Sequence, residues 1–283
     1  MYLYALEQGV EFAAVFADTG NEHEATYEYV RELPRITGGP EITWVKADFA
    51  EQIARKRKRI VQEWPDKIAS RALSVLHPTG IPFLDLCLWK GRFPGSRTRF
   101  CTSELKVIPT VEMVIEPELQ AGHDVYSWQG VRRDESRARS AALETEHQGG
   151  TLWHYRPLVD WSVEDVFAIH KRHGVRPNPL YLQGMTRVGC MPCIMARKAE
   201  LHEIARRFPA HIEKIREWET LVHRAGKSGS TFFCCDKIPG TSTTRGAVDS
   251  VVSWAATTRG GQQFDMLKLL PPPVCSSEYG LCE

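Results

Sequence analysis

The stretch that decides the fold is residues 11–48, EFAAVFADTGNEHEATYEYVRELPRITGGPEITWVKAD. Its first seven residues form an apolar run that fits a buried parallel strand. Residues 23–35 then place Tyr27, Val30 and Leu33 on one face of a helix, and residues 42–48 form a second strand candidate. Residues 2–9 before this stretch have the pattern of the second half of an amphipathic helix. The order helix, strand, helix, strand predicts an α/β fold, a parallel sheet with crossover helices.

The remaining chain continues with helices, loops and one further strand. The predicted elements are a charged helix over 50–64, a Gly- and Pro-rich loop over 78–100, a helix over 102–114, a strand over 123–131, a polar loop over 137–150, a helix capped by Ser162 and Asp165, and helices over 196–207 and 209–225. From Gly226 the composition shifts to Ser, Thr, Gly and Pro. We therefore expect one α/β domain over residues 1–207 and a helix- and loop-rich extension over residues 208–283.

The composition excludes several classes of protein. With 42% hydrophobic and 25% charged residues, the 283-residue chain can bury a sizeable core. Its net charge of +1 is too low for a wholesale electrostatic nucleic-acid binder, so any anion site must be local. The first residues lack the basic start of a signal peptide, and no apolar run approaches the ~18 residues that span a bilayer. We expect a cytoplasmic protein with no membrane contact.

The eight cysteines point to reduced thiols rather than to disulfides. They are Cys87, Cys101, Cys190, Cys193, Cys234, Cys235, Cys275 and Cys282. Cys190 and Cys193 have the C-x-x-C spacing at which two sulfurs hold one metal or cluster iron, although a single pair does not close a site. A redox dithiol or two inert buried thiols are the alternatives. Cys101 begins a predicted helix, where a thiolate is favoured, and Cys275 and Cys282 could reach a site from the tail.

Two stretches could bind an anionic ligand. Asp18, Thr19 and Gly20 end the first strand, which is where open α/β sheets bind ligands. The stretch from Gly130 to Ser136 also follows a strand, and its arginines suit phosphate or sulfate. An ordinary strand-to-helix turn and a solvated charged loop are the alternatives. The basic run Arg55 to Arg59 could contact phosphates, but such a run on a helix is usually a solvated face.

Five stretches in this order resemble the phosphoadenosine phosphosulfate (PAPS) reductase-like family of the adenine nucleotide alpha-hydrolase superfamily. They are VFADTGNEHEATYEYV, RFCTSELKVIP, GVRRDES, PLVDWSVEDVFAIHKRHGVRPNPLY and RVGCMPC. They run from about residue 10 to residue 200. The resemblance implies a parallel α/β sheet that binds an adenine nucleotide (ATP, APS or PAPS) at its strand ends, with residues 1–207 as the nucleotide-binding domain.

The resemblance also implies roles for individual residues. Asp18, Thr19 and Gly20 would lie near the nucleotide. Lys106, Arg132 and Ser136 would contact its phosphate or sulfate, and Gly130 and Arg133 complete the predicted binding set.

The resemblance also implies metal ligands. Cys101, Cys190 and Cys193 match three of the four ligands of a 4Fe–4S cluster, with zinc as the alternative metal. Thr102 stands at the fourth ligand position, so Cys275 or Cys282 would have to substitute. In a second ligand set, Cys190 and Cys193 join both tail cysteines, which leaves Cys101 out.

The sequence departs from the family pattern in two places. The Ser-Gly-Gly-x-Asp-Ser-like phosphate loop that precedes the first helix in the family is missing, so we expect either an N-terminally truncated chain or a protein that has lost the loop. The family's C-terminal Glu-Cys-Gly-x-His motif appears only as Glu278-Tyr279-Gly280-Leu281-Cys282. Tyr279 stands at the nucleophile position, which leaves Cys282 as the candidate catalytic thiol.

Three functions follow from these features. The first is a sulfonucleotide reductase-like enzyme that uses a thioredoxin-like reductant. The second is an ATP-dependent protein that transfers sulfur to nucleic acid, which the basic run Arg55 to Arg59 would support. The third is a non-catalytic remnant that binds nucleotide or metal. We favour the first, on the family resemblance.

Overall fold

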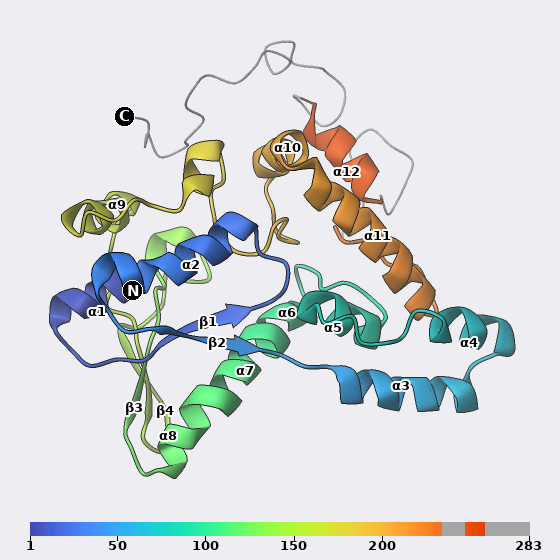
Figure 1. Cartoon of the computed structure of the whole chain (residues 1–283), viewed down its shortest axis with the longest axis horizontal. Helices are drawn as coiled ribbons and strands as arrows, with labels where there is room; N and C mark the ends of the chain where they lie inside the picture. The colour runs from blue at the N-terminus through green and yellow to red at the C-terminus, as the bar shows by residue number, and fades with distance from the viewer. Residues whose placement is uncertain (234–246, 258–283) are drawn as a thin grey trace. The chain divides into compact units, whose positions relative to one another are not determined.

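The computed structural model describes residues 1–233 and 247–257 (Figure 1). The chain forms two compact units, each assembled from three separate segments. Unit 1 comprises Met1–Ala17, Tyr27–Val45 and Ile108–Pro179, and unit 2 comprises Asp18–Thr26, Lys46–Val107 and the described residues from Leu180 onward. The fold is α/β, as predicted. The predicted boundary at residues 207 and 208 follows the chain order, whereas these units interleave, and α10 (Lys198–Arg207) and α11 (Pro209–Ala225) both lie in unit 2.

The strands of unit 1 form two small sheets. β1 (Ala14–Asp18) and β2 (Ile42–Lys46) are hydrogen-bonded neighbours, and their arrows run in the same direction in Figure 1. The intervening helix α2 (Glu24–Thr37) makes them a strand–helix–strand crossover, which confirms the prediction for this region. Only Val45 of β2 is fully buried, and β1 is half-buried along its length.

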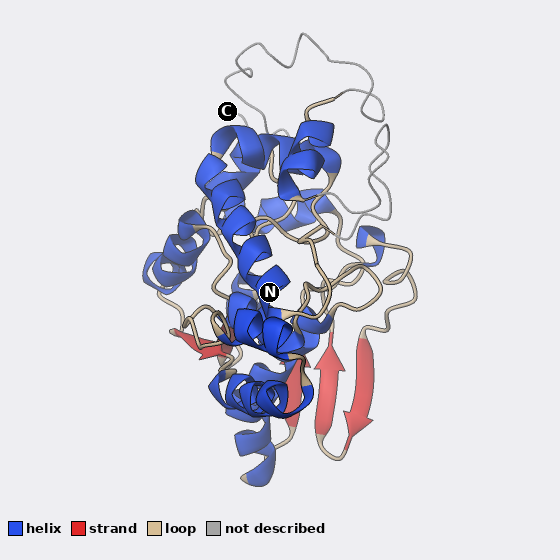
Figure 2. Cartoon of the chain, turned by 90° about the vertical axis from the view of Figure 1, so that its right-hand side faces the viewer, coloured by secondary structure: helices blue, strands red, loops and turns tan. Residues whose placement is uncertain are grey.

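The second sheet has the strand order β3-β5-β4 and stands as three red arrows in Figure 2. β3 (Val125–Trp128) pairs in parallel with β5 (Leu152–Tyr155), and β4 (Thr145–Gly149) adds to β5 in the antiparallel direction. The sequence predicted β3. It did not predict β4, because every residue of that strand is exposed and the stretch reads as a polar loop.

The helices of unit 1 enclose a small core. α1 (Tyr2–Gln8) packs on α9 (Val163–Arg172), and Leu3, Ile169 and Val175 are the buried residues at their contact. The N-terminus of α9 is a full capping box, as predicted from Ser162 and Asp165. Within the described residues, no helix is both long and apolar enough to cross a membrane.

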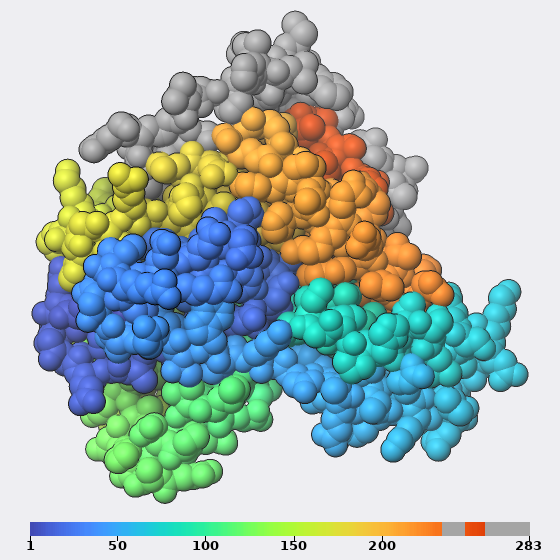
Figure 3. Space-filling model, viewed as in Figure 1, coloured from blue at the N-terminus to red at the C-terminus, as the bar shows by residue number. Residues whose placement is uncertain are grey.

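Among the described residues, unit 2 is built of helices. The helices with their bounds are α3 (Ala50–Glu63), α4 (Asp66–Leu73), α5 (Pro82–Lys90), α10, α11 and α12 (Val248–Ala255). α11 lies against α4, α5, α10 and α12, and in Figure 3 its orange surface adjoins the teal surface of α5. The core of the unit includes the stacked rings of Phe83 and Trp218, 5.7 Å apart.

The predicted loop over residues 78–100 contains α5, which is a correction to the sequence analysis. Pro82 to Leu88 are all buried, so this helix has no polar face and gives no amphipathic signal. The predicted helix over 102–114 is longer than expected. It consists of α6 (Phe100–Thr102), a π-helical turn (Ser103–Val107), α7 (Ile108–Thr110), a second π-helical turn (Val111–Ile115) and α8 (Glu116–Gln120). Short 3-10 helices occur at Arg133–Glu135 and Pro179–Gln183.

Candidate functional site: a loop after the first strand joined to the cysteine pair

The loop that follows β1 is held by the carboxylate of Glu22. Its oxygens accept hydrogen bonds from the backbone N–H of Thr19 (3.1 Å) and of Asn21 (3.2 Å), and from Thr19 Oγ1 (2.7 Å). Thr19, Asn21 and Glu22 are all buried. Asp18 closes the turn by accepting from Gly20 N at 2.8 Å. A buried carboxylate that accepts this many hydrogen bonds fixes the loop in one conformation.

Gly20 is required for two reasons. Its φ of +73° lies in the left-handed region that favours glycine. A Cβ atom there would also lie 2.9 Å from side-chain atoms of both Ile81 and Pro82. Any other residue would therefore push the loop away from the start of α5, where Phe83 N donates to Thr19 O at 2.9 Å.

The same loop contacts the Cys190–Cys193 segment, far away in the sequence. Met191 N donates to Asn21 O at 2.6 Å, and Asn21 Nδ2 donates to Pro192 O at 3.1 Å. Thr19 Oγ1 lies 3.4 Å from the Cys190 sulfur. The structure thus brings together two of the predicted stretches, the one at Asp18 to Gly20 and the C-x-x-C pair.

One buried acceptor of this loop has no partner. Asn21 Oδ1 is buried and receives no hydrogen bond from any described residue. Such an atom costs free energy unless a ligand or an ordered water donates to it. An ordered water enclosed beside Asn21 would satisfy this acceptor.

Burial makes the thiol of Cys190 a poor nucleophile. Burial, followed by the negative charge of Glu22, raises the pKa of Cys190 to about 12. Cys190 also donates to Glu22 Oε1 at 3.6 Å, so the proton is held in place. The exposed ammonium of Lys106, a predicted ligand contact, opposes the shift because it lowers the pKa of both Cys190 and Cys101.

Sequence reasoning missed Asn21 and Glu22, and it also missed three residues that lie on or beside α11. Burial lowers the pKa of His211 to about 4, and its Nδ1 lies 3.0 Å from Met191 O. Burial lowers the pKa of Lys214 to about 8, although the charges of Glu22 and Cys190 raise it. The ring of His23 stacks on that of His211 at 5.1 Å. The spacing of His211 and Lys214 along one helix face was the only signal in the sequence.

The described residues do not form a metal centre. No group of three or more His, Cys, Asp or Glu side chains among them is placed to hold a metal ion. Burial and then Cys193 raise the pKa of Cys101, but these two cysteines do not converge on one point with a third ligand. The predicted ligand Cys275 and the predicted nucleophile Cys282 lie outside the described residues, as do Cys234 and Cys235.

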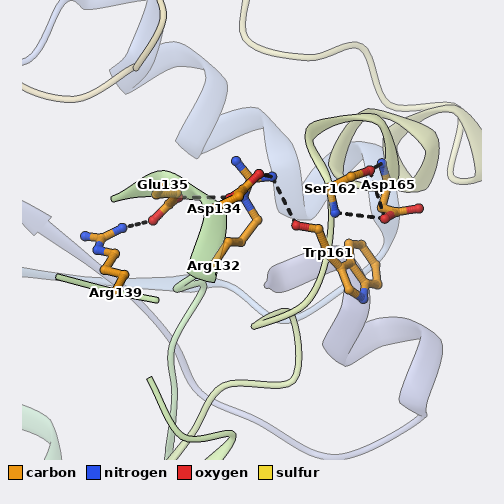
Figure 4. Close-up of polar contacts among 7 residues, drawn as sticks. All are labelled: Arg132, Asp134, Glu135, Arg139, Trp161, Ser162 and Asp165. Atoms are coloured by element: carbon orange, nitrogen blue, oxygen red, sulfur yellow. Dashed lines mark hydrogen bonds and ion pairs between the residues drawn. The ribbon is translucent and has the colours of Figure 1, made fainter. Parts of the chain in front are cut away.

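The predicted arginine loop lies in unit 1, and its guanidinium groups already have partners (Figure 4). Arg132 pairs with Asp134 at 3.1 Å and Glu135 at 3.7 Å, and donates to Trp161 O at 3.2 Å. The Arg132 side chain is 13% exposed, so it is positioned rather than solvated. Glu135 also pairs with Arg139.

Arg133 is bound to residues on both sides of β4 and β5, since Ala142 precedes β4 and Asp160 follows β5. It forms an ion pair with Asp160 and donates twice to Ala142 O, at 3.0 and 2.9 Å. Gly130 and Ser136 are exposed at the two ends of this loop. A phosphate could bind here only if the arginines exchanged carboxylates for it.

A model of the phosphoadenosine phosphosulfate reductase domain matches residues 1–196, more than half of the chain. The chain belongs to the PAPS reductase domain family. The family match covers all five of the resembling stretches, including the loop after β1 and the cysteine pair.

Its relatives include phage proteins and adenosine 5'-phosphosulfate reductases. An uncharacterized 37.8 kDa protein of Escherichia phage 186 is 44% identical over all of this chain and 92% of its own length. The uncharacterized nin region protein ORF290 of phage lambda is 28% identical over 68% of this chain and 60% of its own. An adenosine 5'-phosphosulfate reductase of Burkholderia cepacia is 38% identical, but over only 29% of this chain and 34% of that enzyme. A solved PAPS reductase of Candida auris is 17% identical, with a TM-score of 0.39 over 68% of this chain and 75% of that one.

Proposed function

We propose that this protein binds an adenylated sulfur compound and reduces it or transfers its sulfur group. The observation that carries the proposal is the joining of the loop after β1 to the Cys190–Cys193 segment by the hydrogen bonds of Asn21. Both stretches belong to the part of the chain that matches the family. The loop lies at the carboxyl end of a strand, where open α/β sheets bind nucleotides.

The predicted ligand contacts keep their roles in this proposal. Asp18, Thr19 and Gly20 form the loop itself, and the ammonium of Lys106 is the cation near the thiols that would attract a sulfate or phosphate oxygen. Gly130, Arg132, Arg133 and Ser136 form the arginine loop of unit 1 and stay predicted anion contacts.

The proposed chemistry begins with a cysteine thiolate. It attacks the sulfur of the sulfonucleotide, the bond from that sulfur to the phosphate oxygen breaks, and the adenosine phosphate leaves. The product is a thiosulfonate on cysteine. A thioredoxin-like dithiol then attacks the cysteine sulfur, which releases sulfite and leaves a disulfide that the second thiol of the reductant resolves.

Cys282 is the proposed nucleophile. Burial raises the pKa values of Cys87, Cys101 and Cys190, and only the thiolate form of a cysteine reacts. These three are therefore poor candidates. The reaction needs a reducing compartment, in keeping with a cytoplasmic location.

Mass spectrometry after incubation with APS or PAPS tests this proposal. We expect a thiosulfonate adduct on Cys282 that is lost in Cys282→Ser and kept in the matched variant Cys275→Ser. Nucleotide binding, measured in parallel by calorimetry, should persist in both variants. The proposal is wrong if the full chain neither binds APS or PAPS nor is modified by either of them.

A bound 4Fe–4S cluster or zinc ion would need the tail cysteines, because the described residues do not complete a ligand set. Iron and zinc analysis of protein purified without oxygen decides this question.

ATP-dependent sulfur transfer to nucleic acid is the alternative function, and release of pyrophosphate from ATP only in the presence of nucleic acid would favour it. The basic run gives it little support, because Lys56 and Arg57 bind backbone carbonyls within unit 2.

A further inference from the structure

A cavity of about 560 Å³ opens within unit 2 where two glycine turns meet. Gly91 follows α5 with a φ of 69°, and Gly226 follows α11. A Cβ at Gly226 would lie 2.6 Å from Gly91 O, so the two backbones pack directly on each other. This contact fixes one wall of the cavity and places the segment 226–231, GKSGST, along it.

The lining of this cavity is strongly basic. Its ionisable residues are the cations Lys56, Arg59, Lys90, Arg92 and Lys227 and the carboxylate Glu63. Their formal charges, five positive and one negative, sum to +4, whereas the whole chain carries only +1. A low net charge therefore conceals one concentrated positive site, which attracts anions locally.

Lys56 reduces one source of repulsion for an anion. The carboxyl ends of α5 and α11 both border the cavity, and helix carboxyl ends carry partial negative charge. Lys56 Nζ donates to Leu88 O at 2.7 Å and to Ala225 O at 3.1 Å, at these two ends. Arg71 donates to the carbonyl oxygen of the following residue, Gly226, at 2.8 Å.

Two other cations are held at the cavity without being neutralised. The guanidinium of Arg92 lies 5.5 Å from the ring centre of Phe100, and the ammonium of Lys227 lies 5.1 Å from that of Trp64. Neither forms an ion pair with a carboxylate of residues 1–233 or 247–257. An aromatic face positions a cation but leaves its formal charge intact. By contrast, Lys90 is paired with Glu104 at 2.7 Å.

The segment 226–231 adds hydrogen-bond donors to the charges. Ser230 Oγ accepts from Phe93 N at 3.1 Å, and its own O–H can still donate to a ligand. Ser228 and Thr231 also line the cavity. Hydroxyl groups beside unneutralised cations are the donors that phosphate oxygens require.

We propose that this cavity binds a compact ligand with at least two linked phosphate groups, either inorganic pyrophosphate or the diphosphate of a nucleotide. A single phosphate carries about two negative charges, so it would compensate only about half of the formal charge of +4 on the lining. The volume lies within the ~300–1,000 Å³ range of small-ligand pockets. The cavity shares no residue with the loop at Asp18 to Glu22, so this inference goes beyond the proposed function and does not depend on it.

Calorimetric titration of the full chain with inorganic pyrophosphate tests the proposal. Arg92→Met and Lys227→Met each remove one charge-assisted contact, and we expect each to weaken binding by about tenfold or more. Lys67→Met removes an equal charge from an exposed position of α4 outside the cavity, and it should leave the affinity unchanged. All three side chains are exposed, so thermal unfolding should show the variants folded like the parent chain.

The outcomes separate the two ligand sources. Equal affinities for pyrophosphate and ADP support an inorganic ligand, and tighter binding of ADP supports a nucleotide, provided that the two cavity variants weaken both. No binding of either ligand overturns the proposal, and so does equal weakening by Lys67→Met. Binding of a single-stranded oligonucleotide without binding of pyrophosphate also overturns it, in favour of a nucleic-acid surface. Sulfonucleotide binding should persist in the cavity variants, so failure of one proposal does not imply failure of the other.

Discussion

At the scale of single residues, Cys190 shows how its surroundings decide the chemistry of a thiol. Burial and the charge of Glu22 raise its pKa to about 12, so almost none of it is thiolate at neutral pH. Glu22→Gln removes the nearest negative charge, and we expect alkylation of Cys190 by iodoacetamide near neutral pH to become faster. The rate should rise about tenfold for each unit by which the pKa falls.

Peptide mass spectrometry of the alkylated protein measures this rate. Glu51→Gln, an exposed change on α3, is the matched control and should leave the rate unchanged. Cys87 is fully buried and serves as an internal reporter, because its labelling would indicate unfolding rather than a pKa change. An unchanged Cys190 rate in a folded Glu22→Gln variant would contradict the role given to Glu22.

The buried ammonium of Lys56 makes the free energy of unfolding of unit 2 depend on pH in the alkaline range. Burial, followed by the positive charge of Arg59, lowers the pKa of Lys56 from 10.5 to about 8. Between these two values the unfolded chain binds more protons than the folded chain, so the free energy of unfolding rises with pH. Below about pH 8 both states are protonated at this residue, and its contribution is constant.

Urea unfolding across this pH range measures the effect. In the parent chain the free energy of unfolding should rise with pH between about pH 8 and pH 10.5. We expect Lys56→Met to lose the part of this rise that is due to Lys56. Lys58→Met changes an exposed neighbour on the same helix and should keep that slope. Equal slopes for the parent chain and Lys56→Met would show that the ammonium is not held in the apolar interior.

At the scale of elements, Glu219 on α11 joins two later segments to the helix. Its two carboxylate oxygens accept from Phe232 N at 2.8 Å and from Val248 N at 2.9 Å, so it holds both residue 232 and the start of α12. Glu219→Gln replaces one acceptor with an N–H donor that faces a backbone N–H. We expect a loss of about 1–3 kcal/mol in unfolding free energy.

Hydrogen exchange locates this loss. The amides of Phe232 and Val248 should exchange faster in Glu219→Gln, and those of α11 itself should change less. Glu217→Gln, exposed on the same helix, should leave both amides protected. Protection of both amides in Glu219→Gln would mean that other contacts hold the start of α12.

The capping box of α9 is the corresponding device in unit 1. Ser162 Oγ accepts from Asp165 N at 3.2 Å, and Asp165 Oδ2 accepts from Ser162 N at 2.9 Å. Ser162→Ala should cost about 1 kcal/mol of unfolding free energy. Ser96→Ala, in an exposed loop, should cost much less, as thermal unfolding of both variants would show.

The same cap carries an acid dependence. Hydrogen bonds from Ser162 lower the pKa of Asp165 below its ordinary value of 3.8. The stabilisation is therefore complete above that value and is lost as pH falls through the lower folded value. The stability difference between the parent chain and Ser162→Ala should shrink in acid, and a constant difference would contradict the cap as its source.

At the scale of the whole molecule, patterns within one element were predictable and contacts between distant segments were not. The apolar run of β1, the capping box and the bounds of α11 follow from local sequence, and the structure confirms them. α5 was missed because all its faces are buried.

In the site, the loop and the C-x-x-C pair were each recognised, but Asn21 was not, because its role arises from Pro192, 171 residues away. Lys56 was hidden within a basic run, although Ile53 and Ile60 on the same helix face indicate that it points inward.

The interleaving of the units predicts where the chain can be cut. A chain ending at residue 207 keeps every residue of the domain predicted from the sequence, but it loses α11. That helix buries Ile212, Ile215 and Val222 in the core of unit 2 and stacks Trp218 on Phe83. We expect the 1–207 chain to unfold without cooperativity and to bind the dye ANS, because removal of α11 exposes α5 to water.

A chain ending at residue 257 is the matched control, since it keeps every described element. Its thermal unfolding should be cooperative, like that of the full chain, and it should bind little ANS. Because each unit draws on three segments, a single cut cannot separate them, and damage to unit 2 should follow from loss of α11 alone. If the 1–207 chain instead unfolds cooperatively and resists proteolysis, residues 208–283 are an extension of a domain that folds without them, and the core contacts of α11 contribute little to its stability.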